Sequence, residues 1–351
     1  MSTGTHLFRL NLFGEREQRS GGLRIKAHKR NFPVLQGMSL YTLLLEPKGV
    51  REPHWHANAA ELGYCKNGKV LVSLYGNEDE ASSFLVQTGE VFLIPSGVLH
   101  GIQNIGEEAA ELILSFSSDD PEDFNLSTTM GMFSNSVLGN TWGKEADYFA
   151  SFKRVQEPTF IAICNSGMTS NALSKIPYES HYKTPYLYNL EGAEPLLSNG
   201  GGSARMARQN VWPIAKNQAL YSLRLTGKGM REPHWHPETS ELGYVNRGRG
   251  RMSILNPSGN IDTYVMEEGD IYFIPKAYPH HIENIDDSQD LHVLVFFDQG
   301  MPKDIGFTGS VPFYTSALLA ASTQSPQSLF EGLPRYYRDS FIVDKVNPVD
   351  L

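Results

Sequence analysis

Residues 51–64 read REPHWHANAAELGY, and residues 231–244 read REPHWHPETSELGY. The second stretch begins 180 positions after the first, and the same offset relates His100 to His280. Because this period is far longer than that of a solenoid repeat, each copy has to be a whole domain. A length of 351 residues also agrees with two domains. The sequence therefore predicts a tandem duplication, with domains at residues 1–178 and 179–351.

Each copy carries three histidines and one glutamate at a spacing typical of metal ligands. In an extended strand, His54 and His56 point to one face, and Glu61 follows after a short turn. His100 comes 39 residues after Glu61, on a strand that has to pair beside the first two. The second copy repeats the pattern, including the 39-residue gap. The predicted metal ligands are His54, His56, Glu61 and His100 in the first copy, and His234, His236, Glu241 and His280 in the second.

Three imidazoles and one carboxylate suit a first-row divalent ion, which can be manganese, iron, nickel, copper or zinc. Four protein ligands leave one or two octahedral positions for water, substrate or dioxygen. The alternative is that each histidine is an ordinary hydrogen-bonded residue of the core. A buried cluster of three imidazoles and a carboxylate is costly without a cation, however, and the pattern occurs twice. We therefore expect two divalent ions per chain.

Short β-type runs make up most of each copy. Tyr41–Leu45, Lys69–Tyr75 and Val91–Ile94 combine aliphatic, β-branched and aromatic residues between Gly, Pro or Asn, which is typical of strands. Many short strands separated by turns predict a sandwich or barrel, here a jelly roll. Helical patterns follow each barrel, at residues 125–143 and 313–322. The predicted fold class is all-β with peripheral helices.

Composition excludes several classes of function. The formal net charge is −9 and no block of Lys and Arg stands out, so neither nucleic acid nor an anionic membrane is an expected partner. The two cysteines, Cys65 and Cys164, suggest neither a disulfide framework nor a zinc site. The N-terminus lacks a signal-peptide pattern, and no apolar run reaches 18 residues. The expected compartment is the cytosol, with export by a route that leaves no N-terminal signal as the open alternative.

With these motifs, the chain resembles the cupin superfamily. The matching elements are HxH-x4-E-x6-G from His54 to Gly68 and G-x5-P-x4-H-x3-N from Gly89 to Asn104, each repeated in the second copy. The chain is most similar to bicupin oxalate decarboxylases, which carry an Arg-Glu-x-His-Trp-His run in both halves. The resemblance implies two tandem cupin domains, two manganese ions, a small carboxylate substrate and assembly into a homo-oligomer. It also implies that an arginine matching Arg51 or Arg231 holds the substrate.

The arginine assignment needs an irregular strand. Strict alternation places Arg51 and Trp55 on the face opposite His54 and His56. Because proline favours strand edges and bulges, Pro53 allows Arg51 to turn toward the ligands. The alternative is a solvated surface arginine, and the same choice applies to Arg231.

The chain departs from this family where protons are handled. The family has a lid with a Ser-Glu-Asn-Ser-Thr run in the first half, whereas this chain has the shorter Ser117–Asp123, SSDDPED. Within it, Glu122 is the predicted acid, with Asp120 and Asp123 as alternatives. In the second half, Val295 stands where the family has a glutamate. Loss of a general acid costs roughly 10²–10⁴-fold in rate, so the second ion is expected to be structural or to run other chemistry.

Three functions stay open on the sequence alone. The first is a manganese-dependent decarboxylase acting on oxalate or a similar carboxylate, assisted by dioxygen or a high-valent metal, with Arg51 or Arg231 and Glu122 as catalytic residues. The second is another metal-dependent bicupin oxidase or dioxygenase with the same ligands. The third is a non-catalytic protein that binds metal or a small molecule, because a fold alone does not fix function.

Overall fold

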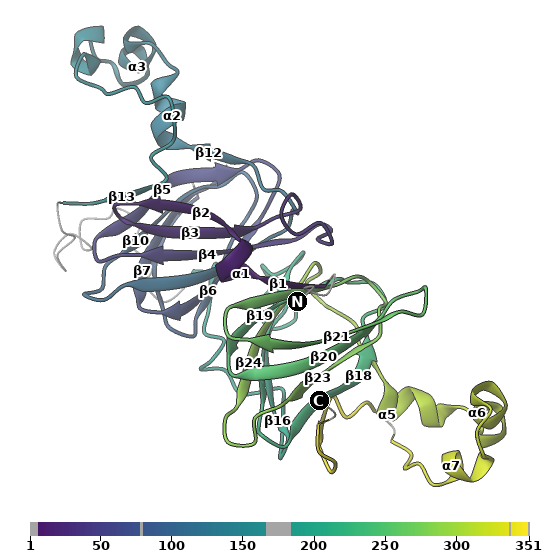
Figure 1. Ribbon diagram of the computed structural model, residues 1–351. Coiled ribbons are helices and arrows are strands. Elements are labelled where there is room, and N and C mark those ends of the chain that lie inside the picture. Colours follow the sequence, from purple (N-terminus) through teal and green to yellow (C-terminus); the bar gives the residue numbers. More distant parts are fainter. Residues whose placement is uncertain (1–5, 78–79, 166–183, 337, 350–351) are drawn as a thin grey trace. The chain divides into compact units, whose positions relative to one another are not determined.

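The strands of the computed structural model form two jelly-roll barrels (Figure 1). The structure describes residues 6–77, 80–165, 184–336 and 338–349. One compact unit, here called the first barrel, comprises Glu15–Asn31 and Gly37–Asn189. The other, the second barrel, comprises Met1–Gly14, Phe32–Gln36 and Leu190–Leu351. The prediction of an all-β fold with two tandem barrels and peripheral helices is confirmed.

The first barrel consists of two facing sheets. Their strand orders are β14-β9-β6-β11-β4-β3-β2 and β12-β5-β10-β7-β8, and β13 also pairs with β5. The strands are β2 (Glu15–Arg19), β3 (Gly22–Ala27), β4 (Ser39–Leu45), β5 (Gly49–His56), β6 (Glu61–Asn67), β7 (Lys69–Tyr75), β8 (Ala81–Gln87), β9 (Val91–Ile94), β10 (Leu99–Asn104), β11 (Ala110–Phe116), β12 (Asp123–Asn125), β13 (Ile161–Ile163) and β14 (Leu187–Tyr188).

The second barrel repeats this topology. Its sheets are ordered β1-β22-β19-β24-β17-β16-β15 and β21-β20-β23-β18-β25, and β26 pairs with β18. The strands are β1 (Leu7–Arg9), β15 (Leu197–Asn199), β16 (Gly202–Ala207), β17 (Ala219–Leu225), β18 (Gly229–Trp235), β19 (Glu241–Arg247), β20 (Arg249–Leu255), β21 (Ile261–Glu267), β22 (Asp270–Ile274), β23 (His280–Asn284), β24 (Leu291–Phe297), β25 (Ile305–Gly306) and β26 (Ile342–Asp344).

The two repeats exchange their first strands. β1, from the start of the first repeat, pairs with β22 of the second barrel, where Leu7 faces Tyr272. β14, from the start of the second repeat, pairs with β9 of the first barrel, where Leu187 faces Phe92. The compact units therefore differ from the predicted domains 1–178 and 179–351 in the assignment of these N-terminal segments. The predicted boundary itself lies outside the described residues.

A single glycine joins two strands in each barrel. Gly68 links β6 to β7 with φ 89°, and Gly248 links β19 to β20 with φ 85°. L-residues with a side chain rarely adopt this left-handed conformation. A Cβ on Gly68 would also lie 2.8 Å from the Cα of Ala110. A residue with a side chain would therefore be strained at these positions, and each first motif ends in glycine.

A helical arm projects from each barrel (Figure 1). The arm of the first barrel contains α2 (Leu126–Gly131), α3 (Asn135–Trp142) and the 3-10 turn η2 (Ala146–Phe149). The arm of the second barrel contains α5 (Phe307–Ser310), η3 (Val311–Phe313), α6 (Ser316–Thr323) and α7 (Gln327–Glu331). These arms confirm the predicted helical regions. A further short helix, α1 (Leu10–Phe13), follows β1, and no helix among the described residues is long and apolar enough to cross a membrane.

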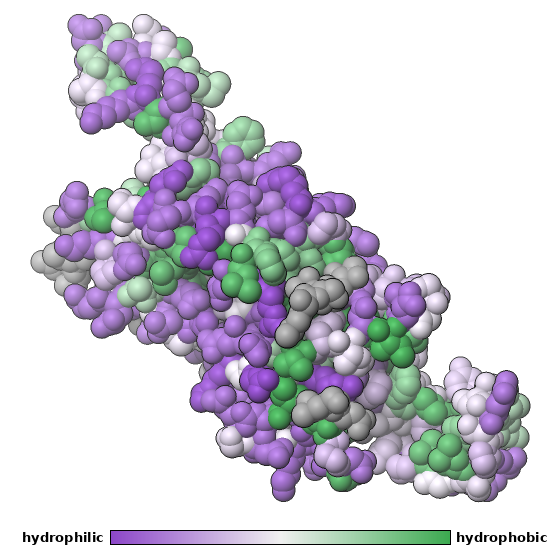
Figure 2. All heavy atoms as spheres, viewed as in Figure 1, coloured by the Kyte–Doolittle hydropathy of each residue, from purple (hydrophilic) through white to green (hydrophobic). Residues whose placement is uncertain are grey.

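Both arms expose apolar side chains. In the first arm Met132 is 74% exposed and Trp142 is 55% exposed, and in the second arm Phe313 is 84% exposed. Figure 2 shows hydrophobic atoms gathered over α6 and α7. Large apolar side chains at this level of exposure are typical of surfaces that contact another molecule.

Candidate metal centres

A bulge in β5 brings an arginine to the same face as two ligand histidines. His100 of β10 faces His54, but Ile102 faces Arg51, so β5 has one extra residue between these pairs. The extra residue falls at Glu52-Pro53, where proline favours such an irregularity. β18 has the same shift between Arg231 and His234. The irregular strand expected near Pro53 is confirmed, and the arginines are not solvated surface residues.

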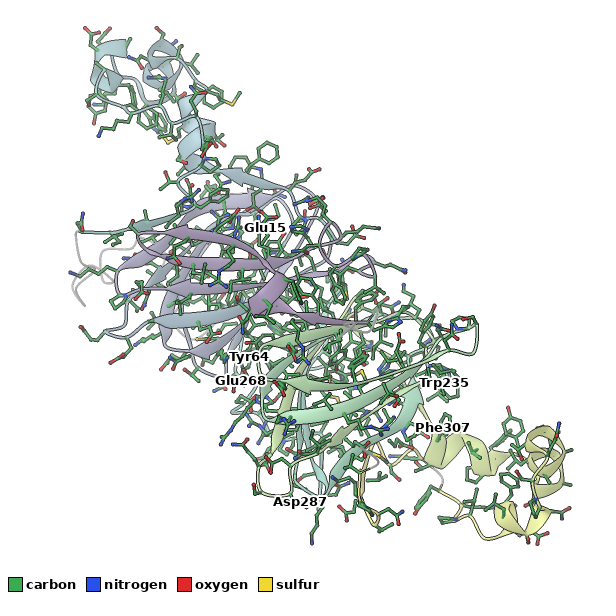
Figure 3. All side chains as sticks on the ribbon, in the orientation of Figure 1. Glu15, Tyr64, Trp235, Glu268, Asp287 and Phe307 are labelled. Carbon is green, nitrogen blue, oxygen red and sulfur yellow. The ribbon has the colours of Figure 1, made fainter. Side chains whose placement is uncertain are left out.

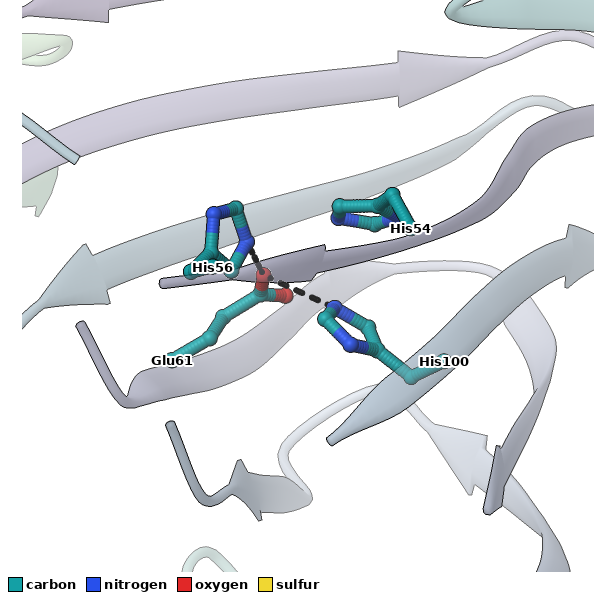
Figure 4. A group of neighbouring side chains, drawn as sticks. All are labelled: His54, His56, Glu61 and His100. Carbon is teal, nitrogen blue, oxygen red and sulfur yellow. Dashed lines mark hydrogen bonds and ion pairs between the residues drawn. The ribbon is translucent and has the colours of Figure 1, made fainter. Parts of the chain in front are cut away.

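The four predicted ligands of the first barrel meet inside it (Figure 4). His56 Nε2 lies 3.1 Å from Glu61 Oε2, and His100 Nε2 lies 3.3 Å from the same oxygen. The ring centroids of His54 and His100 are 4.1 Å apart. All four side chains are buried, and their ligand atoms lie within 4.8 Å of one another. They come from β5, β6 and β10, three strands contributed by both sheets.

The second barrel repeats this cluster with its own four residues. His236 Nε2 lies 2.9 Å from Glu241 Oε2, and His280 Nε2 lies 3.3 Å from it. The rings of His234 and His280 are again 4.1 Å apart. The ligand atoms of this buried group also fall within 4.8 Å of one another. The structure thus brings together all eight residues that the sequence predicted as ligands.

The donor atoms are oriented as a metal ion requires. His54 Nδ1 lies 2.8 Å from the carbonyl of Glu52, and His100 Nδ1 lies 2.9 Å from that of Val98. These carbonyls accept a hydrogen bond from Nδ1–H, so Nε2 keeps a free lone pair. In the second barrel, His234 and His280 contact the carbonyls of Glu232 and Tyr278 in the same way. Glu61 Oε1 and His280 Nε2 are buried without a hydrogen-bond partner, as expected of atoms that bind an ion. The residues therefore fit a divalent metal.

Local electrostatics favour the metal-binding protonation states of His54 and Glu61. Burial and the nearby Arg51 guanidinium hold the pKa of His54 well below its ordinary value, so its imidazole stays neutral. Burial acts to raise the pKa of Glu61, but hydrogen bonds and charge from His100 and His56 lower it to about 2. At neutral pH the cluster therefore contains a neutral imidazole at His54 and an ionised carboxylate at Glu61.

Arg51 lines the first cavity but is already paired with protein groups. Its Nη1 donates to Asn125 Oδ1 at 2.7 Å, and its Nη2 donates to Asp123 Oδ2 at 3.1 Å. Burial and the neighbouring Arg24 lower the pKa of Arg51 to about 10, which leaves it charged at neutral pH. The cavity is small and is otherwise lined by His54, His56, Glu61 and apolar groups, with Arg24 as a second cation.

Arg231 has the corresponding place in the second barrel. It donates to Asp304 and, at 2.9 Å, to the carbonyl of Phe341, whose ring lies 3.7 Å from its guanidinium carbon. Val295 lines the small cavity of the second barrel, and Leu114 lines that of the first.

The predicted acid, Glu122, does not line the cavity. Glu122 is exposed, and its backbone N–H donates to Asn58 at 2.9 Å. The neighbouring Asp123, one of the two alternatives, reaches inward to lie 2.8 Å from His56 Nδ1. A catalytic role for Glu122 stays a prediction.

Other residues of β5 and β18 lie outside the cavities and contact the helical arms. Glu52 accepts hydrogen bonds from Ser127 and from the Phe160 amide, and Glu232 binds Thr308 and Phe341 in the same way, so each fixes the root of its arm. Trp55 stacks on Phe124, outside the cavity. Trp235 meets Phe307 edge-on with centroids 6.1 Å apart (Figure 3). The prediction that Trp55 points away from the ligands is confirmed, and Trp235 also lies outside its cavity.

Two jelly-roll barrels, each with a buried three-histidine, one-glutamate cluster, define a duplicated metal-binding protein. The chain belongs to the cupin family, whose model matches residues 10–146 and 188–324.

Among curated relatives, the chain is similar to the oxalate decarboxylase OxdC of Bacillus subtilis, at 27% identity over 79% of this chain and 72% of that one. A probable oxalate decarboxylase of Arthroderma benhamiae is 24% identical over 82% and 71% of the two chains. The oxalate oxidase GF-2.8 of Triticum aestivum is 36% identical over 24% of this chain and 39% of its own. A solved structure of Bacillus subtilis oxalate decarboxylase with Mn(II) centres superposes with a TM-score of 0.87 at 23% identity, covering 98% and 90% of the two chains. These likenesses confirm the resemblance to bicupin oxalate decarboxylases.

Proposed function

We propose that this protein is a metal-dependent enzyme that converts oxalate or a similar small carboxylate to carbon dioxide and formate. The observation that carries the proposal is the bulge in β5, which places the Arg51 guanidinium in one small cavity with the metal ligands His54, His56 and Glu61. A cation beside a metal is complementary to a small anion with two carboxylates. The similarity to oxalate decarboxylases over most of the chain supports the same substrate class.

A bound divalent ion, for which we propose manganese, would polarise the substrate carboxylate and offer one-electron chemistry. Arg51 orients the carboxylate by exchanging its bond to Asp123 for a bond to the substrate. The apolar walls of Ile102, Leu114 and Phe116 exclude water from the cavity. Breaking the carbon–carbon bond releases carbon dioxide and leaves a carbon that has to take up a proton. We assign this proton to Glu122, whose side chain reaches the cavity only after the loop 117–123 turns inward.

The test compares Arg51→Lys with the matched variant Arg231→Lys, each at full metal loading. Lysine keeps the charge but loses the planar fork that grips a carboxylate, so Arg51→Lys is expected to lower kcat/KM for oxalate by about 10²-fold or more. Arg231→Lys is expected to change it little, because Val295 leaves the second cavity without an acid. The reverse result places the chemistry in the second barrel, and two small effects mean that neither arginine holds the substrate.

One observation favours a second candidate, an oxidase. Apart from the ligand glutamates, no acidic residue lines either cavity in the described part of the chain. Oxidation of oxalate by dioxygen gives two molecules of carbon dioxide and one of hydrogen peroxide, and no carbon has to be protonated. Measuring formate against peroxide from oxalate at acidic pH distinguishes the two reactions. A metal-loaded protein that forms neither product is instead a binding protein.

We also propose a homo-oligomer in which the exposed apolar residues of the arms meet other copies of the chain. Phe313 is 84% exposed and Met132 is 74% exposed, and apolar side chains gathered on one surface mark sites of protein–protein contact. Phe313→Ser is expected to lower the mass measured by light scattering. An unchanged mass with intact barrels would argue against the arms as the interface. The cytosolic location stays a prediction.

A further inference from the structure

The glutamate ligands of the two centres have different partners. In the second barrel the hydroxyl of Tyr272 donates to Glu241 Oε1 at 2.7 Å. The duplicated position in the first barrel is Phe92, which has no hydroxyl, and Glu61 Oε1 is buried without a hydrogen-bond partner. Both rings lie over a glycine: a Cβ added to Gly63 or Gly243 would fall 2.2 Å from the Phe92 ring or 2.0 Å from the Tyr272 ring. The two aromatic side chains therefore take the same place, and the hydroxyl is the difference.

One histidine ligand also differs between the centres. His56 Nδ1 lies 2.8 Å from the Asp123 carboxylate. Its counterpart His236 instead bonds through Nδ1 to the neutral carbonyl of Lys303 at 2.8 Å, and Asp304 stays 3.8 Å away. Asp123 and Asp304 are structural equivalents, because the residues that follow them, on β12 and β25, both pair with the strand that carries the ligand histidines.

Arg24 accounts for the position of Asp123. It is 4% exposed and donates from Nη1 to Asp123 Oδ2 at 2.7 Å and from Nε to Glu17 at 2.6 Å. Arg51 binds the same Oδ2, so Oδ1 is left to face His56. Ala204 stands at the duplicated position in the second barrel and cannot hold Asp304 in this way.

The arginines beside the centres are paired with carboxylates in both barrels. Arg24 pairs with Glu17, and Arg51 pairs with Asp123. In the second barrel, Arg231 pairs with Asp304. We therefore attribute the difference between the centres to the groups that contact their ligands.

We propose that the residues contacting the ligands make the two centres unequal, although their ligands are identical. The reduction potential of the trivalent/divalent couple is lower in the first centre than in the second. A carboxylate at Nδ1 makes an imidazole a stronger electron donor than a carbonyl does. A hydroxyl that donates to a ligand carboxylate makes it a weaker donor. Both differences favour the higher oxidation state in the first barrel and the divalent state in the second. Tyr272, Asp123 and Arg24 are thus positioning residues for the metals, and the inference rests on the proposed metal occupancy.

The experiment uses full-length proteins with one centre each, carrying either His234→Ala plus His236→Ala or His54→Ala plus His56→Ala. Each protein is loaded with Mn²⁺ and titrated electrochemically with a mediator, so that the electrode takes one electron from each ion. Electron paramagnetic resonance measures the Mn²⁺ that remains at each potential. The first centre is expected to show the lower potential. Phe92→Tyr should raise the potential of the first centre, and Tyr272→Phe should lower that of the second. Each should change the ratio of trivalent to divalent ion about tenfold, which is about 59 mV for one electron.

Matched variants separate tuning from general disturbance. Asp123→Asn should raise the potential of the first centre. If Phe92→Tyr does not fold, Asp123→Asn and Tyr272→Phe still test the inference. Tyr264→Phe removes a hydroxyl that contacts Met252 rather than a ligand, and it should leave the potential of the second centre unchanged. Equal potentials in the two centres, or no shift with Tyr272→Phe, would overturn this inference alone. A failure to bind Mn²⁺ at either centre would overturn the proposed function as well.

Discussion

The exchange of first strands gives a prediction about which barrel each end of a repeat stabilises. Phe8 lies on β1, pairs with Ile271 of β22, and is only 6% exposed. Its ring stacks on Phe32 with centroids 5.0 Å apart. Truncating a buried phenylalanine to alanine costs about 3–5 kcal/mol. Phe8→Ala is therefore expected to destabilise the second barrel, although Phe8 belongs to the first repeat in the sequence.

Hydrogen exchange followed by mass spectrometry measures this effect segment by segment. A loss of about 3–5 kcal/mol raises the opening constant of β22 by two to three and a half powers of ten, since about 1.4 kcal/mol is tenfold. Amides of β9, in the first barrel, should keep their protection. The matched variant Tyr188→Ala should open β9 and spare β22, with a smaller effect because Tyr188 is only half-buried. Faster exchange in β9 but not in β22 after Phe8→Ala would refute the exchange of strands.

Three further predictions concern metal, pH and the arms. His54→Ala plus His56→Ala should leave one ion per chain by elemental analysis, and chelation of the wild-type protein should lower its melting temperature; two ions in the variant would contradict the ligand assignment. Burial lowers the pKa of His292 to about 3. Between about pH 6.5 and pH 3, His292 is therefore protonated in the unfolded state but neutral in the folded state. Stability should therefore fall as pH drops through this window, and His292→Gln should flatten the dependence measured by urea unfolding. Glu52→Ala removes three hydrogen bonds to Ser127 and Phe160, worth roughly 3 kcal/mol or more together, and should speed proteolysis of residues 126–160, whereas Glu232→Ala should not.

The metal ligands and the barrel could be predicted because their signals are local or duplicated. The HxH spacing places His54 and His56 on one face, and the repeat identifies Glu241 and His280 without an alignment. The proline in the quoted stretch was sufficient to expect the bulge that turns Arg51 inward. Each of these arguments needs only a few neighbouring residues or the comparison of two halves.

Pairings between distant residues could not be predicted in this way. β1 and β14 have similar sequences, so nothing in either one indicates which barrel it joins. The partnership of Arg24 with Asp123 joins residues 99 positions apart, and it depends on the full barrel. One signal was available: Phe92 and Tyr272 break the match between the copies at a buried position. Such differences within a duplication indicate where two similar sites diverge.

The bulge in β5 has a consequence for any attempt to redesign the substrate range. Because of the bulge, the consecutive residues Arg51 and Glu52 point in different directions. Arg51 lines the cavity, and Glu52 binds the root of the arm. The carbonyl of Phe160 accepts a hydrogen bond from the Glu52 amide at 2.9 Å, and from Arg51 Nη1 at 3.4 Å. A library that varies the cavity alone would therefore shift the arm, and a graft of a foreign arm would move the arginine. Engineering of this protein has to treat the strand, the arginine and the arm root as one exchangeable module.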